Sequence, residues 1–209
     1  MENLILYCFM AMAFIVMPGA DFTLIMKTTL TNGRKAGQLT ACGIAAGLIF
    51  HTAAAVLGLS AIVAKSAYLF DIVKYIGAAY LFYLGITSLR ATDTQQSYDA
   101  ADTDKTVTDD DHWGNFMQGV LANILNPKTV IFYLTFLPQF VVQSKSVMPQ
   151  LIILGVILVI LSLTWFAFLA YALGHIRKYF DNPIFKSRIQ KVTGLLLISF
   201  GLKLALDKK

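Results

Sequence analysis

A helix-breaking pair and an ionisable residue occur together inside the apolar segment Leu4–Met26. Pro18 and Gly19 come first, and Asp21 follows two residues later. Proline has no N–H to bond the carbonyl of Phe14, and glycine lets another group approach the backbone closely. Asp21 could therefore bind an ammonium group, carry a proton, or cap the half-helix that follows the break. The sequence leaves these three roles open.

A second break of the same kind, Asn126-Pro127-Lys128, lies in a later apolar segment. Pro127 frees the carbonyl of Asn123, while Asn126 can cap the half-helix that starts at Pro127. The break lies about ten residues into its segment, roughly 15 Å deep and so near the centre of a hydrocarbon core about 30 Å thick. The positive helix end and Lys128 favour a nearby anion, which is either Asp21 or the carboxylate of a small zwitterion.

The composition places these breaks in a membrane protein. Hydrophobic residues make up 57% of the 209 residues, and the mean hydropathy is +0.66. A soluble all-α protein with very apolar helices is the alternative. So large a hydrophobic fraction, however, exceeds what the core of a soluble domain can bury. We expect one all-α domain with six membrane-spanning helices at Leu4–Met26, Leu39–Val63, Leu69–Leu89, Phe116–Val142, Leu151–Leu173 and Val192–Leu206.

The two halves of the chain resemble each other. At the start of the third predicted helix of the first half, Lys74 and Gly77 are three residues apart. Lys191 and Gly194 have the same spacing at the start of the third predicted helix of the second half. A proline also interrupts the first helix of each half. Because three crossings reverse the orientation of the second copy, we expect an inverted repeat, as in many secondary transporters. The predicted parts are a first three-helix repeat at 1–90, a flexible acidic cytoplasmic linker at 91–112 and a second repeat at 113–209.

The distribution of Lys and Arg predicts the orientation. Basic residues collect in the first, third and fifth loops, at Lys27, Arg34, Lys35, Arg90, Lys105, Arg177, Lys178, Lys186, Arg188 and Lys191. The positive-inside rule makes these loops cytoplasmic, so that both termini lie outside. The net charge of +5 then faces anionic lipid, and we expect no nucleic-acid partner.

His51 is a further ionisable residue inside a predicted span. Gly43, Gly47 and His51 are each four residues apart and share a helical face, where small residues let helices pack closely. His51 could relay a proton at the interface between the repeats, or it could hydrogen-bond a neighbouring helix as a neutral imidazole.

The motifs also carry a family resemblance. The break Pro18-Gly19-Ala20-Asp21, the run from Asn126-Pro127-Lys128-Thr129 to Phe136-Leu137-Pro138-Gln139-Phe140, the acidic linker and the six-span layout resemble the LysE/RhtB family of amino-acid exporters. The resemblance implies a multi-pass protein of the prokaryotic cytoplasmic membrane that expels amino acids or derivatives such as homoserine, threonine or lysine, driven by the proton gradient. Many family members have a second proline where this chain has Ala20, which leaves this break softer.

These observations together predict a proton-coupled amino-acid exporter rather than an enzyme. We expect no cofactor and no resident metal, and a homo-oligomer is possible. Asp21 and His51 are the coupling candidates, and the expected substrate-binding residues are Pro18, Gly19, Asp21, Asn126, Pro127 and Lys128. Two alternatives stay open. One is a divalent-cation exporter with Asp21 and His51 as ligands, although it has few further donors. The other is a membrane thiol carrier that uses Cys8 and Cys42, which the predicted topology places in different leaflets.

Overall fold

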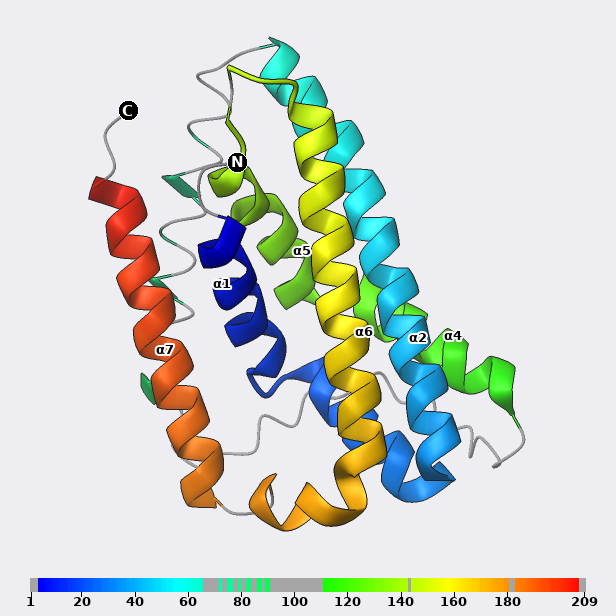
Figure 1. The fold of residues 1–209 in the computed structure, drawn as a ribbon. Helices are drawn as coiled ribbons and strands as arrows, with labels where there is room; N and C mark the ends of the chain where they lie inside the picture. Colours follow the sequence, from blue (N-terminus) through cyan, green and yellow to red (C-terminus); the bar gives the residue numbers. More distant parts are fainter. Residues whose placement is uncertain are drawn as a thin grey trace.

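The computed structural model describes residues 4–65, 111–142, 144–180 and 183–206, together with residues 72, 75, 76, 79, 82, 83, 86, 87, 89 and 90. Its regular elements are helices, and no strand occurs among these residues, as the sequence predicts for an all-α protein. The elements, labelled in Figure 1, are α1 (Leu4–Val16), α2 (Ala20–Lys65), α4 (His112–Ile124), α5 (Pro127–Thr135), the 3-10 helix η1 (Leu137–Phe140), α6 (Val147–Phe180) and α7 (Pro183–Leu206).

The predicted break at Pro18 separates α1 from α2. Helix α1 ends at Val16 and α2 begins at Ala20. Within α2, Gly33 has non-helical torsion angles (φ 85°, ψ 173°), and the chain turns back there before continuing to Lys65 (Figure 1). A positive φ is readily adopted only by glycine. The first predicted span therefore corresponds to α1 and the part of α2 before Gly33, and the second to the rest of α2.

The predicted break at Pro127 separates α4 from α5. Helix α4 ends at Ile124, α5 begins at Pro127, and the pair α4 and α5–η1 is bent by 53°. Asn126 caps α5, because its side-chain Oδ1 accepts the backbone N–H of Lys128 at 3.0 Å. Proline suits the first helical position, where an N–H would have no partner within the helix.

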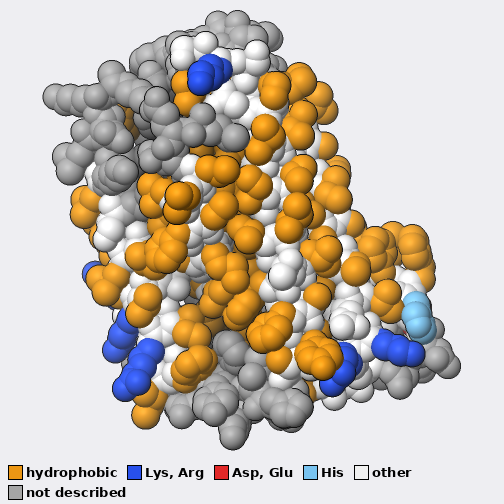
Figure 2. Space-filling view, viewed as in Figure 1, with side chains coloured by type: hydrophobic (Ala, Val, Ile, Leu, Met, Phe, Trp, Pro, Cys, Tyr) orange, Lys and Arg blue, Asp and Glu red, His pale blue; other side chains and the backbone are white. Residues whose placement is uncertain are grey.

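Several helices are long and apolar enough to cross a membrane. Ala20–Gly58 and Val147–Leu173 qualify on their own, and the bent pair formed by His112–Ile124 and Pro127–Phe140 can form a third span. Apolar side chains cover much of the surface in Figure 2, as expected for contact with lipid. The chain is an all-α membrane protein. The predicted span Leu69–Leu89 falls mostly outside the described residues, as do Lys74 and Gly77 of the internal match.

Small residues bring α2 and α4 into backbone contact. A methyl group added at Gly43 would overlap the carbonyl of Phe116, and one added at Gly119 would overlap the carbonyl of Thr40. A methyl group at Gly47 would lie 2.7 Å from Oδ1 of the Asn123 side chain. The predicted glycine face of α2 is therefore the face that packs against α4.

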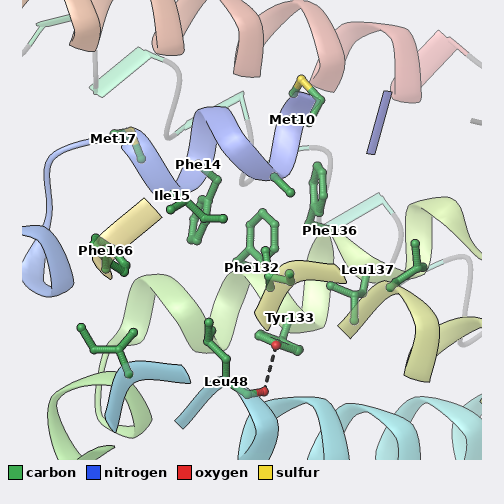
Figure 3. Packing of buried hydrophobic residues seen from close by; sticks show 14 of the residues in the cluster. Met10, Phe14, Ile15, Met17, Leu48, Phe132, Tyr133, Phe136, Leu137 and Phe166 are labelled. Atoms are coloured by element: carbon green, nitrogen blue, oxygen red, sulfur yellow. Dashed lines mark hydrogen bonds between the residues drawn. The ribbon is translucent and has the colours of Figure 1, made fainter. Parts of the chain in front are cut away.

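An aromatic cluster joins α1 to α5 beside this contact. The ring of Phe14 stacks on that of Phe132, with centroids 3.8 Å apart, and Phe132 stacks on Phe136 at 4.4 Å (Figure 3). All three side chains are buried. Because Phe14 occupies the last turn of α1, this packing holds the end of that helix against α5.

Candidate substrate-binding site

Asp21 receives hydrogen bonds from both sides of the second break. Its Oδ2 accepts from Nδ2 of Asn123 at 2.9 Å, and its Oδ1 accepts from Nδ2 of Asn126 at 3.2 Å. Asp21 lies in the first turn of α2, where the helix dipole favours a carboxylate. The two breaks, more than 100 residues apart in sequence, therefore meet at this carboxylate.

Lys128 reaches the first break from the opposite direction. Its Nζ donates to the carbonyl of Phe14 at 3.2 Å and to that of Met17 at 3.4 Å, and it lies 4.4 Å from the centroid of the Phe14 ring. The Phe14 carbonyl is the one that Pro18 leaves without an N–H partner. The carboxyl end of α1 is also the negative end of its dipole, and it offsets the unfavourable position of Lys128 in the first turn of α5.

His51 contacts a freed carbonyl at the second break, as Lys128 does at the first. Its Nε2 lies 3.2 Å from the carbonyl of Asn123, the group that Pro127 frees within the helix. Because a carbonyl oxygen can only accept, Nε2 must carry the proton. The backbone N–H of Asn126 also donates to this carbonyl, at 3.1 Å. Asn123 thus contacts Asp21 through its side chain and His51 through its backbone, and each break is held by a side chain from the other half of the sequence.

A small cavity of about 30 Å³ lies between the two breaks. Its polar lining consists of Asp21, Asn126, Lys128, Thr129 and Ser162, and its larger apolar lining residues are Phe14, Ile15, Met17, Phe22, Leu48, Leu158 and Phe166. The volume suffices for about one or two waters and is too small for an amino acid. In this conformation the cavity therefore has no room for such a ligand.

The cavity has one carboxylate and one ammonium on its walls. The Asp21 carboxylate is bonded to side-chain amides, and the Lys128 ammonium to backbone carbonyls. In this part of the described chain the two charged groups interact through space, with no hydrogen bond between them. The cavity lining therefore carries two opposite charges. A zwitterionic ligand has an ammonium group that can pair with Asp21 and a carboxylate that can pair with Lys128.

The structure places the six predicted binding residues around the two breaks. Four of them line the cavity, namely Gly19, Asp21, Asn126 and Lys128. Pro18 and Pro127 shape the backbone at the breaks without lining the cavity. His51 does not line it either, and its ring contacts the backbone carbonyl of Asn123.

Several groups at this site are not indicated by the sequence. For Asn123 the sequence indicates the backbone carbonyl alone, although an amide three residues before Asn126 on an apolar helix is a signal for its side chain as well. Ser162 and Phe166 lie on α6, where nothing in the sequence distinguishes them from other residues of a long apolar run.

The geometry fits the family that the motifs resemble, and a comparison with known families decides the matter. The family model described as LysE type translocator matches residues 12–208. The chain belongs to the LysE type translocator family. Its match includes both breaks, Asp21, His51 and the whole α6 wall of the cavity.

Individual relatives cover nearly the whole translocator. It is 43% identical over 210 residues to the uncharacterized membrane protein YrhP of Bacillus subtilis, with 99% of this chain and 100% of the relative covered. It is 30% identical over 200 residues to the leucine efflux protein of Salmonella typhimurium, with 93% and 91% covered. No solved structure matches the translocator.

Proposed function

We propose that this translocator exports neutral amino acids across the prokaryotic cytoplasmic membrane in exchange for protons. The observation that carries the proposal is a cavity that has both Asp21 and Lys128 in its lining, between two broken helices. A free amino acid has one ammonium and one carboxylate group. The site offers one partner for each.

Each broken helix has its own part in binding. The substrate ammonium and the coupling proton compete for binding to Asp21. The amino end of α5 and Lys128 receive the substrate carboxylate, since both attract an anion. To do so, Lys128 exchanges its contacts with the carbonyls of Phe14 and Met17 for a contact with the substrate.

The remaining walls favour an uncharged side chain. Beyond Asp21 and Lys128 the cavity has no ionisable lining residue, and most of that lining is apolar. A second charge on the substrate would lie in this apolar surrounding without a partner, at a large cost. The name of the leucine efflux relatives agrees with this substrate class.

His51 is proposed to assist the proton step. It shares Asn123 with Asp21: a change in the charge of Asp21 alters the bonding of the Asn123 side-chain amide, and the backbone carbonyl of the same residue faces the imidazole. Asn123 thus connects the two candidate coupling residues, Asp21 and His51. This arrangement assigns His51 a positioning role, with Asp21 as the group that exchanges the proton.

We further propose six spans arranged as two inverted repeats, 1–90 and 113–209, joined by the linker 91–112. Exposed basic side chains support the orientation. Lys27, Arg34 and Lys35 flank the turn of α2 at Gly33, and Arg188 and Lys191 lie near the start of α7. Most of the basic side chains in Figure 2 lie toward the lower end, and one lies at the upper end. The lower end would be cytoplasmic. Helix α1 begins and α7 ends toward the opposite end (Figure 1), as external termini require.

The proposal is tested by flux measurements on purified protein in sealed vesicles. Vesicles loaded with labelled leucine are given a pH gradient, and efflux is compared with that of lysine, glutamate and divalent cations. We expect gradient-dependent movement of leucine that Asp21→Asn abolishes, while the capping variant Asp111→Asn at the exposed start of α4 keeps it. Movement of cations without leucine, or full leucine efflux by Asp21→Asn, would contradict the proposal.

A further inference from the structure

Helix α6 forms a third wall of the cavity, separate from the two broken helices. Leu158, Ser162 and Phe166 are each four residues apart and lie on one face of α6. All three side chains are buried, with exposed fractions of 1%, 2% and 3%. In Figure 3 Phe166 lies beside Ile15 and Met17 of the first break. This face of α6 therefore lines the cavity together with the two breaks.

The Ser162 hydroxyl is not bonded to its own helix, unlike several of the described hydroxyls in helix interiors. Thr40, Thr52, Thr135 and Ser199 each donate to the carbonyl four residues earlier, the usual arrangement for such residues in a helix. Within the described chain, Ser162 makes no such bond, although its side chain is 98% buried. The hydroxyl instead opens onto the cavity.

The Ser162 hydroxyl lies on the cavity wall and has no hydrogen-bond partner among the described residues, which is unfavourable unless the cavity supplies one. Its cost is offset when a ligand or a water in the cavity supplies the missing hydrogen bond. The neighbours on the same face, Leu158 and Phe166, offer only apolar surface. This face of α6 thus presents one hydroxyl group between apolar side chains.

We propose that this face of α6 contacts the side chain of the substrate, and that Ser162 determines which side chains are accepted. The inference rests on the proposed function, because Asp21 and Lys128 must hold the ammonium and carboxylate for the side chain to face α6. It adds a named specificity residue to that function. Since the cavity of about 30 Å³ is too small for an amino acid, its walls must move apart when substrate enters.

Valine and threonine provide a matched pair of substrates, because they have the same shape and differ by a methyl and a hydroxyl group. Their ratio of uptake is measured by competition in vesicles containing wild-type protein, Ser162→Ala or Thr164→Ala. Thr164 lies on the same helix but is exposed. We expect Ser162→Ala to shift the ratio toward valine by about three- to tenfold, the effect of one hydrogen bond, and Thr164→Ala to leave it unchanged. An unchanged ratio in Ser162→Ala would overturn the inference.

A binding measurement complements the flux ratio. In a background with Cys8→Ser and Cys42→Ser, we expect valine to slow the reaction of Ser162→Cys with a small thiol reagent, and to leave the reaction of Thr164→Cys unchanged. If valine does not change the rate at which Ser162→Cys is labelled, or if this thiol does not react, the result contradicts the proposed contact between α6 and the substrate side chain. Failure of wild-type protein to move any amino acid would instead reject the proposed function, so the two failures are distinguishable.

Discussion

The Nζ atom of Lys128 lies 3.2 Å from the carbonyl oxygen of Phe14, the acceptor that Pro18 leaves without a helical N–H partner. The two residues come from different halves of the sequence. In hydrocarbon, a freed carbonyl must find a partner inside the protein, and Lys128 supplies one. The same contact connects α5 to the end of α1, so the polar groups of the site also hold the two broken helices together.

Replacing Lys128 by Met should therefore lower stability as well as transport. The variant keeps much of the side-chain length but leaves the carbonyls of Phe14 and Met17 without their donor. We expect a loss of about 1–3 kcal/mol, the cost of leaving buried polar groups unpaired. Thermal unfolding in detergent measures it, with Lys35→Met, at an exposed position of α2, as the control. Equal unfolding temperatures in the two variants would contradict the structural role of Lys128.

The same variant tests the carboxylate assignment. If Lys128 binds the substrate carboxylate, Lys128→Met should weaken inhibition of leucine transport by free leucine more than inhibition by leucine methyl ester, which lacks the negative charge. The ratio of the two inhibition constants separates this effect from a general loss of activity. Equal losses for both compounds would leave Lys128 with its structural role alone.

The close approach of α2 and α4 predicts opposite outcomes for two glycines of the same helix. At Gly43 an added methyl group would overlap the Phe116 backbone, which no side-chain rotation can relieve. At Gly58 nothing lies within 4 Å of the added atom. Gly43→Ala should cost at least about 1–3 kcal/mol, whereas Gly58→Ala should be neutral or stabilise by up to about 1 kcal/mol. Thermal unfolding of both variants decides the matter, and a harmless Gly43→Ala would contradict the observed contact.

The sequence predicted the backbone features of this site better than its side-chain contacts. Pro18 and Pro127 have no N–H, so the two breaks and the freed carbonyls of Phe14 and Asn123 follow from covalent structure alone. Gly43, Gly47 and His51 likewise share a face by helical periodicity, and that face does pack against α4.

Which groups meet across the site depends on tertiary packing. The sequence predicts an anion near Lys128. In the structure its hydrogen bonds go to the carbonyls at the negative end of α1, and Asp21 interacts with it through space. No local pattern indicates the position of that helix end relative to α5. For the same reason Ser162 could not be distinguished within α6, because the face that meets the cavity depends on how α6 packs against the breaks.

The N-cap residues of α4 and α5 offer a test of the dual role of Asn126. Asp111 caps α4 at an exposed position, through a 2.7 Å bond from the N–H of Gly114, and Asn126 caps α5 while its amide also donates to Asp21. Each change to Ala should cost about 0.5–2 kcal/mol through the lost cap. Only Asn126→Ala should also impair leucine efflux in vesicles, because it removes a partner of Asp21. Equal transport by the two variants would contradict this role.

A hydrogen-bonded trio beside the cavity predicts energetic coupling between α2 and α5. The Tyr133 hydroxyl lies 2.9 Å from the carbonyl of Leu48 and 2.9 Å from Oγ1 of Thr52 (Figure 3 shows the bond to Leu48). Thr52 also donates to Leu48, at 2.8 Å, so that both hydroxyls serve one carbonyl. Tyr133→Phe and Thr52→Val should each cost about 1 kcal/mol.

Because the two hydroxyls contact each other and share that acceptor, the double variant should not show the sum of the two costs. We expect a coupling energy of about 0.5–1 kcal/mol in a double-mutant cycle measured by unfolding in detergent. Tyr7→Phe provides the control for the loss of a buried tyrosine hydroxyl, since its bond goes to the carbonyl of Leu154 at 2.7 Å. Additivity in the Tyr133 cycle would mean that the trio does not join α2 to α5.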